Sequence, residues 1–531
     1  MQNKYNYVFI CFFIATYFYG ILNLLSPIPV QDSWDQIYHF LNHKTELSNW
    51  ISLHNEHLIY TARIFYYLNN LIFNAHPYGL ILLNNLFVIL GLYLFVIIFK
   101  KVNLIKSEET SRFYSLIFIL PFFWSQKSNF IWDVQAQQIY TQIFALLLFI
   151  LHFYINYKKL YKFIPFAFLL LFFELGAMAN GVISALMLIL ISLLDIKKIN
   201  KIYFFGLLIL TLCTVIIYYL QIENVVKNNL NIIYFFKHFF AFFGFFLSLL
   251  GSVLGFILGK SIYAMVIAGS LTFVVIICLF KAIFKMINKR DTHNYEYISL
   301  ILFCIFLIVT SILISFGRAD SESMKSAFSG RYSTVSIYFW LSIYIIFFKD
   351  IKKYINTIIF YVFIFLLALY QITAYKDSSN KILERECAFI ELYLTNNPKD
   401  YEKLYPDKNR LLEIFSESLS ENYMIFEEYK KYISSNTELK NLFSFNNITN
   451  FEFNDVHENF QKISFSATLK MKEQIQGKGF LKLIEDNRVI GFLKAKKING
   501  KKYNLCGYVQ NEKITQSDLI ELKFESYEPA I

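Results

Sequence analysis

Several patterns that would indicate a metal-binding, repetitive or secreted protein are missing from this chain. It has 6 cysteines in 531 residues, and none forms a CxxC pair or a Cys/His arrangement with zinc spacing. No segment repeats at a fixed period, which argues against a solenoid. The first apolar run, about residues 5–25, has no small-residue cleavage site before Pro27 and Pro29. We therefore expect a retained signal anchor.

Charged residues are also scarce. They make up 17% of the chain, whereas 56% is hydrophobic and 19% is aromatic. So strong an apolar bias over this length indicates that the bilayer is the solvent, and it predicts a polytopic α-helical membrane protein. The formal net charge of +11 comes largely from short lysine clusters between apolar runs. The positive-inside rule accounts for these clusters, so we expect no binding to nucleic acid.

The apolar runs predict about 11 membrane spans. They cover roughly 5–25, 77–99, 113–125, 138–156, 163–178, 181–195, 202–220, 261–280, 297–316, 333–348 and 355–375. Five basic clusters separate them, around residues 100–112, 158–162, 197–201, 281–290 and 349–353. A further apolar run covers about 236–258, and all five clusters can be cytoplasmic only if either this run or the run at 261–280 does not cross fully. The run at 236–258 contains Gly244, Gly251, Gly255 and Gly259, so we expect an interfacial or re-entrant segment there.

The span count predicts two domains in a multi-pass protein of the cell's inner (plasma) membrane, with the N-terminus in the cytoplasm. Residues 1–375 form the transmembrane domain, whose outer-face loops are 26–76, 125–137, 221–258 and 317–332. Residues 376–531 form a small extracytoplasmic α+β domain, helical over 378–435 and β-rich over 460–526. Cys387 and Cys506 are the two cysteines of this second domain. They could form a disulfide there, but their spacing leaves the pairing open.

Two acids follow the first span. Asp32 and Asp35 are three residues apart, so both carboxylates would project from one face of a short helix that begins after Pro29. A carboxylate near the membrane interface can act as a general base for a substrate hydroxyl. The alternative is that Asp32 only caps the helix that includes residues 34–41. Two acids are more than a cap requires, so we favour a catalytic role for at least one.

The same outer loop contains the densest polar cluster outside the tail, His54-Asn55-Glu56-His57. Five of the nine histidines fall in this loop region. Glu56 and a histidine could hold a divalent cation together with Asp32 or Asp35, but the spacing is not that of the helical zinc proteases. We assign no metal ligands and no other cofactor. Contacts to a sugar or phosphate and a structural hydrogen-bond hub are the remaining alternatives.

Other outer-face residues suit the binding of a sugar or a phosphate. Trp132 and Gln135 offer a stacking face and an amide, although a membrane rim uses the same residue types. Glu174 and Asn180 lie near the turn between two predicted spans, where a structural role for Glu174 is equally reasonable. Two arginines and a tyrosine border another outer loop, and they could clamp a phosphate or meet lipid headgroups instead. These three residues are Arg318, Arg331 and Tyr332.

Together these residues resemble a known architecture, the integral membrane glycosyltransferases of the GT-C fold. More narrowly, the set resembles a group of bacterial membrane glycosyltransferases. The motifs that carry the resemblance are Asp32-x-x-Asp35, Trp50 followed by His54-Asn-Glu-His57, Trp132 with Gln135, Met178-Ala-Asn-Gly181, and Gly317-Arg318 with Arg331-Tyr332. They cover about residues 1–375 and leave out the tail. The acids of the family are usually adjacent or spaced by one, so either Asp32 or Asp35 could be the match.

The resemblance implies transfer of one sugar from a polyprenyl-phosphate donor to an acceptor hydroxyl on a cell-surface glycan or lipid. The expected partners are the lipid-linked sugar, the acceptor and membrane lipids. The expected catalytic residues are Asp32, Asp35 and Glu56. The expected substrate-binding residues are His54, Asn55, His57, Arg63, Trp132, Gln135, Asn180, Arg318, Arg331 and Tyr332.

Three alternatives remain open at the level of sequence. A transporter or flippase of lipid-linked saccharides would need a polar pathway through the membrane, whereas most polar candidates here lie on one face. A sensor or scaffold would use the tail as its working part. An O-antigen polymerase or ligase would use a long outer loop and arginines.

Overall fold

The computed structural model divides the chain into two compact units. The first comprises Met1–Ile21, Thr45–Tyr66 and Gly79–Tyr375, and the second comprises Leu22–Lys44, Tyr67–Tyr78 and Lys376–Ile531. The second unit therefore includes parts of the first outer loop, which the sequence division had placed with the transmembrane domain. The described residues are 2–26, 28–43, 46–54, 57–73, 76–103, 111–225, 238–259, 261–289, 294–318, 324–354, 356–396, 398–420, 445–455, 460–469, 480–485, 488–499, 502–510 and 523–527.

Helices dominate the first unit. Long runs with apolar residues on every side form helices that can be buried in protein or lipid. Its elements, some of which continue into the second unit, are α1 (Gln2–Leu24), α3 (Leu47–Trp50), β1 (Leu53–His54), β2 (His57–Leu58), α4 (Tyr60–Phe73), α5 (Tyr78–Asn103), α6 (Ser111–Ile119), η2 (Leu120–Phe122), η3 (Trp124–Gln126), α7 (Lys127–Ile131), η4 (Asp133–Gln135), α8 (Ala136–Asn156), η5 (Tyr161–Phe163), α9 (Ile164–Leu175), α10 (Asn180–Leu194), α11 (Lys201–Val225), α13 (Phe239–Leu250), α14 (Ser252–Ile257), α15 (Ile262–Lys289), α16 (Tyr295–Arg318), η6 (Met324–Phe328), η7 (Gly330–Tyr332), α17 (Ser333–Ile346), α18 (Phe348–Tyr354) and α19 (Thr357–Thr395).

The chain is a polytopic helical membrane protein. Within the described residues, seven helices are long and apolar enough to cross a membrane, or eight if the bent pair α17–α18 is counted as one span. Three of the 11 expected spans are shorter than this. The run at 113–125 breaks into α6, η2 and η3, the run at 163–178 becomes the 12-residue α9, and the run at 181–195 becomes the 15-residue α10.

The glycine-containing run at 236–258 is broken. It forms α13 of 12 residues and α14 of 6 residues, which meet at Gly251. A Cβ atom at Gly251 would lie 2.8 Å from the backbone oxygen of Ala268 on α15. Glycine therefore allows the break to pack closely against the neighbouring helix. Neither piece is long enough by itself to span a bilayer.

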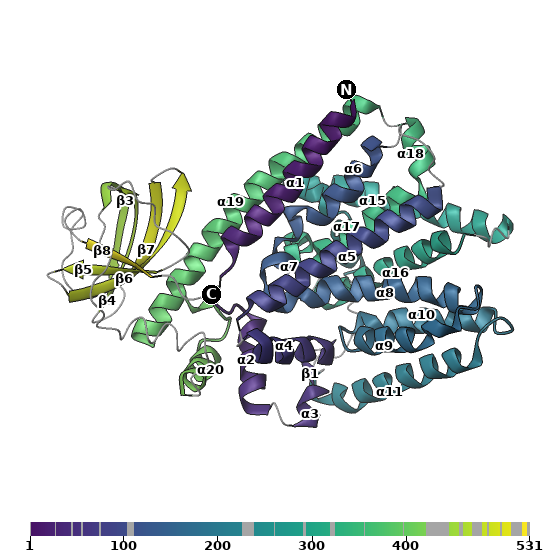
Figure 1. The fold of residues 1–531 in the computed structure, drawn as a ribbon, viewed down its shortest axis with the longest axis horizontal. Helices are drawn as coiled ribbons and strands as arrows, with labels where there is room; N and C mark the ends of the chain where they lie inside the picture. The colour runs from purple at the N-terminus through teal and green to yellow at the C-terminus, as the bar shows by residue number, and fades with distance from the viewer. Residues whose placement is uncertain are drawn as a thin grey trace. The chain divides into compact units, whose positions relative to one another are not determined.

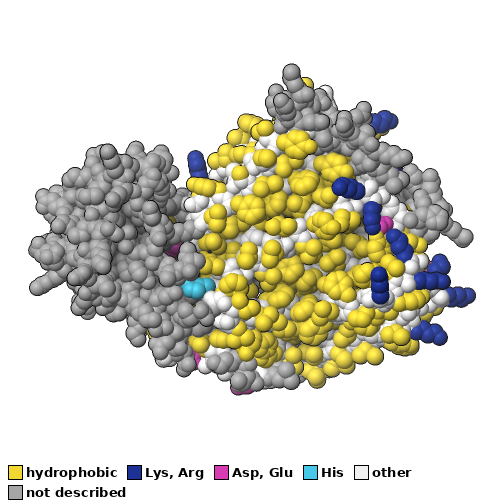
Figure 2. Space-filling model, viewed as in Figure 1, with side chains coloured by type: hydrophobic (Ala, Val, Ile, Leu, Met, Phe, Trp, Pro, Cys, Tyr) yellow, Lys and Arg dark blue, Asp and Glu magenta, His cyan; other side chains and the backbone are white. Residues whose placement is uncertain are grey.

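Several helix ends that lie near lysine clusters meet at one edge of the first unit. At the end of α5, Lys101 donates to Glu296 at the start of α16 over 2.9 Å, and Tyr154 near the end of α8 donates to the same carboxylate. Asn156, at the end of α8, accepts from the backbone of Asn200 just before α11. Figure 2 shows Lys and Arg side chains gathered along one margin of a broad hydrophobic face. This pattern is typical of one membrane boundary.

Helices α1 and α19 lie side by side, although they stand at opposite ends of the helical part of the chain (Figure 1). Near their first turns the Tyr361 hydroxyl donates to Asn6 over 3.0 Å. Further along, the Gln371 amide donates to the Thr16 hydroxyl over 3.2 Å. Buried amide and hydroxyl pairs of this kind satisfy polar groups where water is excluded and fix the helix register.

The second unit combines helices with a sheet. It contains α2 (Asp32–His43), the part of α19 after Tyr375, η8 (Tyr401–Lys403) and α20 (Lys408–Ser420). Six antiparallel strands follow in the order β3-β4-β7-β6-β5-β8. They are β3 (Phe445–Asp455), β4 (Phe460–Leu469), β5 (Phe480–Glu485), β6 (Arg488–Asn499), β7 (Lys502–Gln510) and β8 (Lys523–Tyr527). The sheet begins at β3, before the β-rich region expected from the sequence. Of the expected helical region, residues 421–435 lie outside the described part.

Cys387 on α19 and Cys506 on β7 form a disulfide. Their Cα atoms are 6.1 Å apart, and 119 residues separate them in the sequence. The pairing that the spacing left open is therefore present in the structure. It ties the sheet to the helix that leaves the first unit.

Candidate functional site

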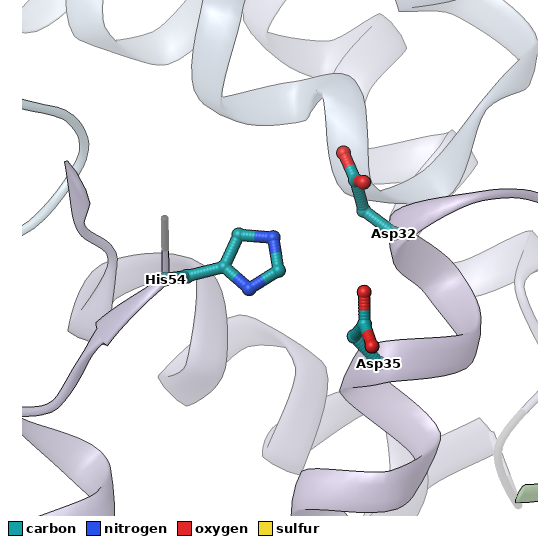
Figure 3. A group of neighbouring side chains, drawn as sticks. All are labelled: Asp32, Asp35 and His54. Atoms are coloured by element: carbon teal, nitrogen blue, oxygen red, sulfur yellow. The ribbon is translucent and has the colours of Figure 1, made fainter. Parts of the chain in front are cut away.

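The two acids lie on the first turn of α2, within the second unit. Asp32 and Asp35 project from the same side of this helix (Figure 3), and an oxygen atom of one lies within 4.8 Å of an oxygen atom of the other. Both side chains are partly buried. The three-residue spacing thus has the geometric result expected from a helical turn. Two neighbouring carboxylates can share the work of accepting a proton, or bind a hard cation through oxygen.

The entry to α2 is fixed by the segment before α20. Gln31 has a φ of 51°, in the left-handed region that residues other than glycine rarely adopt. Its backbone N–H donates to the carbonyl of Leu404 over 2.7 Å, and its side-chain amide donates to the carbonyl of Glu402. The N–H groups of Ser33 and Trp34 donate to the carbonyls of Val30 and Gln31. These early N–H groups therefore do not depend on Asp32 as a cap.

Tyr405 holds one of the acids directly. Its hydroxyl donates to Oδ1 of Asp35 over 2.8 Å. Burial, reinforced by the carboxylate of Asp35, raises the pKa of Tyr405 well above its usual value, so the hydroxyl stays protonated and donates. Farther along α2, the Arg410 guanidinium lies 3.7 Å from the Tyr38 ring centroid, and Asn42 donates to Glu417 over 2.8 Å. The segment up to α20 therefore braces the acid-bearing helix.

The histidines of the predicted cluster lie on a small hairpin in the first unit. Strands β1 and β2 pair Leu53 with Leu58 and His54 with His57 in antiparallel register. Both histidines are partly buried, and Figure 3 also draws the His54 side chain. Asn55 and Glu56, which come between the two strands in the sequence, lie outside the described residues. Their expected roles therefore stay predictions.

The hairpin is fastened to the end of α11. The side-chain oxygen of Gln221 accepts the N–H of Leu53 over 2.9 Å, and its NH₂ group donates to the carbonyl of Ile51 over 3.0 Å. The Tyr218 hydroxyl accepts the N–H of Leu58 over 2.9 Å. These contacts fix the backbone on both sides of the histidine pair. They do not involve the side chains of His54 and His57, so a structural role for the polar cluster stays a prediction beside the binding of a sugar or phosphate.

Asn180 belongs to a buried cluster around Glu174. The Glu174 side chain is 0% exposed, and its Oε1 accepts from Ser184 on α10 over 3.2 Å. The start of α4 reaches the same turn, where the N–H of Thr61 donates to the carbonyl of Gly176 over 3.0 Å. Within the described residues, Oε2 of Glu174 and Oδ1 of Asn180 have no hydrogen-bond partner. The sequence correctly singled out this turn as polar, and the structure shows that it joins α4, α9 and α10.

Two buried amide side chains, those of Asn84 and Asn129, connect the backbone at Trp132 with the backbone at Arg331. The Asn129 side chain donates to the carbonyl of Arg331 over 3.2 Å and to the Thr334 hydroxyl over 2.7 Å. Asn84 on α5 donates to the carbonyls of Asn129 and Trp132. The Arg331 guanidinium lies 4.9 Å from the ring centroid of the buried Tyr332. Gln135, on η4 soon after Trp132, is also buried.

Arg318 is placed less completely. It is the last residue of α16, and residues 319–323 after it lie outside the described part of the chain. Its expected cooperation with Arg331 therefore stays a prediction. Arg63 lies on α4, where its guanidinium donates to three backbone carbonyls before the hairpin.

Sequence reasoning missed Tyr405, Gln221 and Asn129. Tyr405 lies 370 residues from Asp35, so no local pattern could connect the two. Gln221 ends an apolar run and reads as a polar boundary residue. Asn129 lies on α7 between Trp124 and Trp132, and this position is the one weak signal that could have marked it.

Comparison of the chain with protein-family models, curated proteins and solved structures gives no match. The functional interpretation therefore depends on the residues and the geometry described above.

Proposed function

We propose that this chain is a membrane glycosyltransferase of GT-C type. It moves a sugar from a polyprenyl-phosphate donor to an acceptor hydroxyl on a cell-surface glycan or lipid at the outer face of the plasma membrane. The observation that carries the proposal is the pair of acids on the first turn of α2, one of them held by the Tyr405 hydroxyl. A carboxylate held in a fixed orientation can position the acceptor hydroxyl, while the neighbouring carboxylate on the same helical turn takes its proton.

The reaction is a substitution at the anomeric carbon. The acceptor oxygen forms a bond to this carbon while the bond to the phosphate oxygen breaks, and the acceptor proton passes to Asp32 or Asp35. The polyprenyl phosphate leaves with the bonding electrons, so cationic side chains that stabilise it lower the barrier. Asp35 already accepts one hydrogen bond, from Tyr405. We therefore assign proton abstraction to Asp32 and an orienting role to Asp35.

The other predicted residues surround the substrates in this proposal. His54, Asn55 and His57 hydrogen-bond the sugar or acceptor, and Glu56 orients one of them or completes a divalent cation site with an aspartate. Trp132 stacks on a sugar face, while Gln135 and Asn180 hydrogen-bond hydroxyl groups. Arg318 and Arg331, with Tyr332, are the sequence-derived candidates for contact with the leaving phosphate.

Two independent features support the proposed orientation. Disulfides persist in oxidising compartments, so the bond between Cys387 and Cys506 favours an extracytoplasmic second unit. The acids on α2 belong to this unit. The lysine-bearing helix ends of the first unit favour a cytoplasmic edge where they meet. Eleven crossings with a cytoplasmic N-terminus satisfy both features if α6, α9 and α10 cross as shortened helices.

Substitution of the acids tests the function. Asp32→Asn and Asp35→Asn preserve size and remove the negative charge. Each should reduce sugar transfer by about 10²-fold or more, because Asp32→Asn removes the general base and Asp35→Asn removes the group that orients the acceptor. The measurement is mass spectrometry of surface glycans and of lipid-linked sugars from cells that carry each variant at equal protein abundance. Asp377→Asn is the matched control, since Asp377 is an exposed acid on α19.

The expected result is a surface glycan that lacks one sugar in both acid variants and is intact in the control. An unchanged glycan with an altered distribution of the lipid carrier across the membrane would indicate transport instead. An unchanged glycan and an unchanged carrier in both acid variants would refute the catalytic role of α2.

A further inference from the structure

Arg63 is a buried arginine, and only one of its three side-chain nitrogens donates hydrogen bonds to described residues. It lies on α4 in the first unit and is 6% exposed. One nitrogen, Nη1, donates to the carbonyls of Asn49, Trp50 and Ser52 over 2.5, 3.1 and 2.7 Å. Its other nitrogens, Nε and Nη2, are buried and have no hydrogen-bond partner among the residues that the structure describes. The side chain therefore uses only part of its donor capacity in holding the loop.

The charge of Arg63 also has no counter-ion among the described residues. Among the described residues, none of the recorded ion pairs involves this guanidinium. Burial lowers the pKa of Arg63 to about 10, so the group still carries its positive charge at neutral pH. Burying a charge without a counter-ion is energetically costly. Hydrogen bonds to three carbonyl groups offset only part of that cost. An anion bound beside it would remove this penalty.

The covalent geometry of the group indicates which anion fits. In a guanidinium, the N–H bonds of Nε and of Nη2 point in parallel along one edge of the plane. This edge matches two oxygens of a phosphate or carboxylate, with two parallel hydrogen bonds. In Arg63 this edge is the unpartnered one, while the loop carbonyls occupy Nη1. No acceptor among the described residues meets this edge, and an acceptor with two oxygens would fit it.

The frame around Arg63 is rigid on both sides. The loop that it holds continues into β1, which Gln221 fastens to α11 through Ile51 and Leu53. Two residues before Arg63, the Thr61 hydroxyl donates to the carbonyl of Phe173 over 2.7 Å and anchors α4 to α9. A ligand at this position therefore meets a side chain that is already oriented, and it loses little free energy in ordering it.

We propose that Arg63 is an oxyanion-binding residue whose Nε–Nη2 edge takes two oxygens of a phosphate group, while Nη1 keeps the loop at 49–52 in place. The inference deepens the proposed function, on which it rests for the source of the phosphate: the monophosphate of the polyprenyl carrier. Free inorganic phosphate offers the same chemistry. Arg63 thereby becomes the first candidate for the phosphate contact, ahead of the less buried Arg318 and Arg331.

A binding experiment on the full chain in lipid nanodiscs tests this assignment. The probes are polyprenyl monophosphate in the disc and inorganic phosphate in solution, and the readout is the rise in unfolding temperature with ligand concentration. Wild type should show a saturable rise with the lipid phosphate. Arg63→Lys keeps the charge but loses the two-pronged edge, so we expect affinity to fall about tenfold or more; Arg63→Gln should abolish measurable binding.

Gln221→Leu is the matched control. It loosens the same loop without touching the guanidinium, so the affinity should fall by no more than about fivefold, the effect of one neutral hydrogen bond. A loss equal to that of Arg63→Gln would show that loop order rather than the guanidinium governs binding, and would overturn the proposal. So would equal affinity in wild type and Arg63→Gln, or absence of stabilisation of wild type by either probe.

The two probes and a transfer assay separate this inference from the proposed function. Arg63-dependent stabilisation by inorganic phosphate as strong as that by the lipid would support the oxyanion site and identify free phosphate as a sufficient source. Arg63-dependent binding in a protein that transfers no sugar would refute the glycosyltransferase proposal alone. Normal sugar transfer by Arg63→Gln would refute the role of Arg63 alone.

Discussion

At the scale of single residues, the acid pair on α2 illustrates how similar side chains acquire different roles. Asp35 receives a hydrogen bond from a tyrosine whose hydroxyl is held in its neutral form, whereas Asp32 stands at the start of the helix next to a residue with positive φ. A carboxylate that accepts a hydrogen bond from a fixed donor loses rotational freedom, so its oxygens are held in one orientation. Two acids on one turn therefore become one oriented group and one group available for a proton.

Tyr405→Phe isolates this orienting contact, because it removes the hydroxyl and keeps the ring. A hydrogen bond to a charged group contributes about 1.5–3 kcal/mol, so we expect kcat for sugar transfer to fall about tenfold or more with little change in KM. The acid limb of the pH–rate profile should also move to higher pH, since Asp35 loses a donor that stabilises its charged form and has to stay ionised to orient the acceptor. Steady-state kinetics from about pH 4 to 9 on purified protein in nanodiscs measures both effects.

Tyr401→Phe is the control, because Tyr401 lies on η8 of the same segment and its hydroxyl makes no recorded hydrogen bond to a described residue. Its rate and its pH profile should match wild type. If Tyr405→Phe also keeps the wild-type rate and profile, the contact is only structural and Asp35 needs no orientation.

The sequence predicted how the two acids are arranged on their helix, but it did not predict which residues contact them. The three-residue spacing of Asp32 and Asp35 was enough to place both on one face, because helical geometry is local. The donor from Tyr405 was not predictable, because it depends on how α20 and the segment before it fold back on α2. Arg63 was singled out as a binding residue, but its burial and its unpartnered edge depend on the loop at 49–52, whose shape the sequence does not encode locally.

At the scale of elements, the turn between α9 and α10 explains why two expected spans became short helices. Gly176 ends α9, and the chain reverses within four residues before Asn180 begins α10. Hydropathy shows that this region is apolar, but it cannot locate a reversal that depends on close backbone contact. A Cβ atom at Gly181 would lie 2.0 Å from the carbonyl oxygen of Glu174, so only glycine fits there.

Gly181→Ala should therefore destabilise the first unit. The added methyl group meets backbone rather than a mobile side chain, so relief requires α9 and α10 to separate, at a cost of about 1–3 kcal/mol or more. We expect the thermal midpoint of the purified protein to fall by several degrees, as measured by intrinsic fluorescence on heating. Gly317→Ala is the matched control, since nothing lies within 4 Å of its added Cβ.

The control should be neutral or slightly stabilising, because alanine favours a helix over glycine by up to about 1 kcal/mol. An equal fall in both variants would mean that the glycines act through backbone conformation alone. An unchanged midpoint in Gly181→Ala would contradict the close packing of the turn.

At the scale of the whole molecule, membrane topology and disulfide chemistry constrain each other. Apolar length and lysine clusters were visible in the sequence, so the helical membrane class followed from them. The number of spans did not follow as readily, because α6, α9, α10 and the pair α13–α14 are shortened by turns inside apolar runs. The disulfide depends on the fold of residues that are distant in the sequence, and once formed it favours one compartment for the second unit.

Cysteine labelling of intact cells tests this arrangement. In a background where the four unpaired cysteines are replaced by alanine, we introduce one reporter at Lys381 or at Lys197. Lys381 is exposed on α19 in the second unit, and Lys197 is exposed after α10 near the lysine-bearing edge. A membrane-impermeant maleimide should label the first reporter and not the second, and both should react after permeabilisation. Cys387 and Cys506 should stay unlabelled until a reductant is added. Labelling of the reporter at Lys197 alone would invert the topology and place the acids of α2 in the cytoplasm, where the proposed donor and acceptor would not meet them.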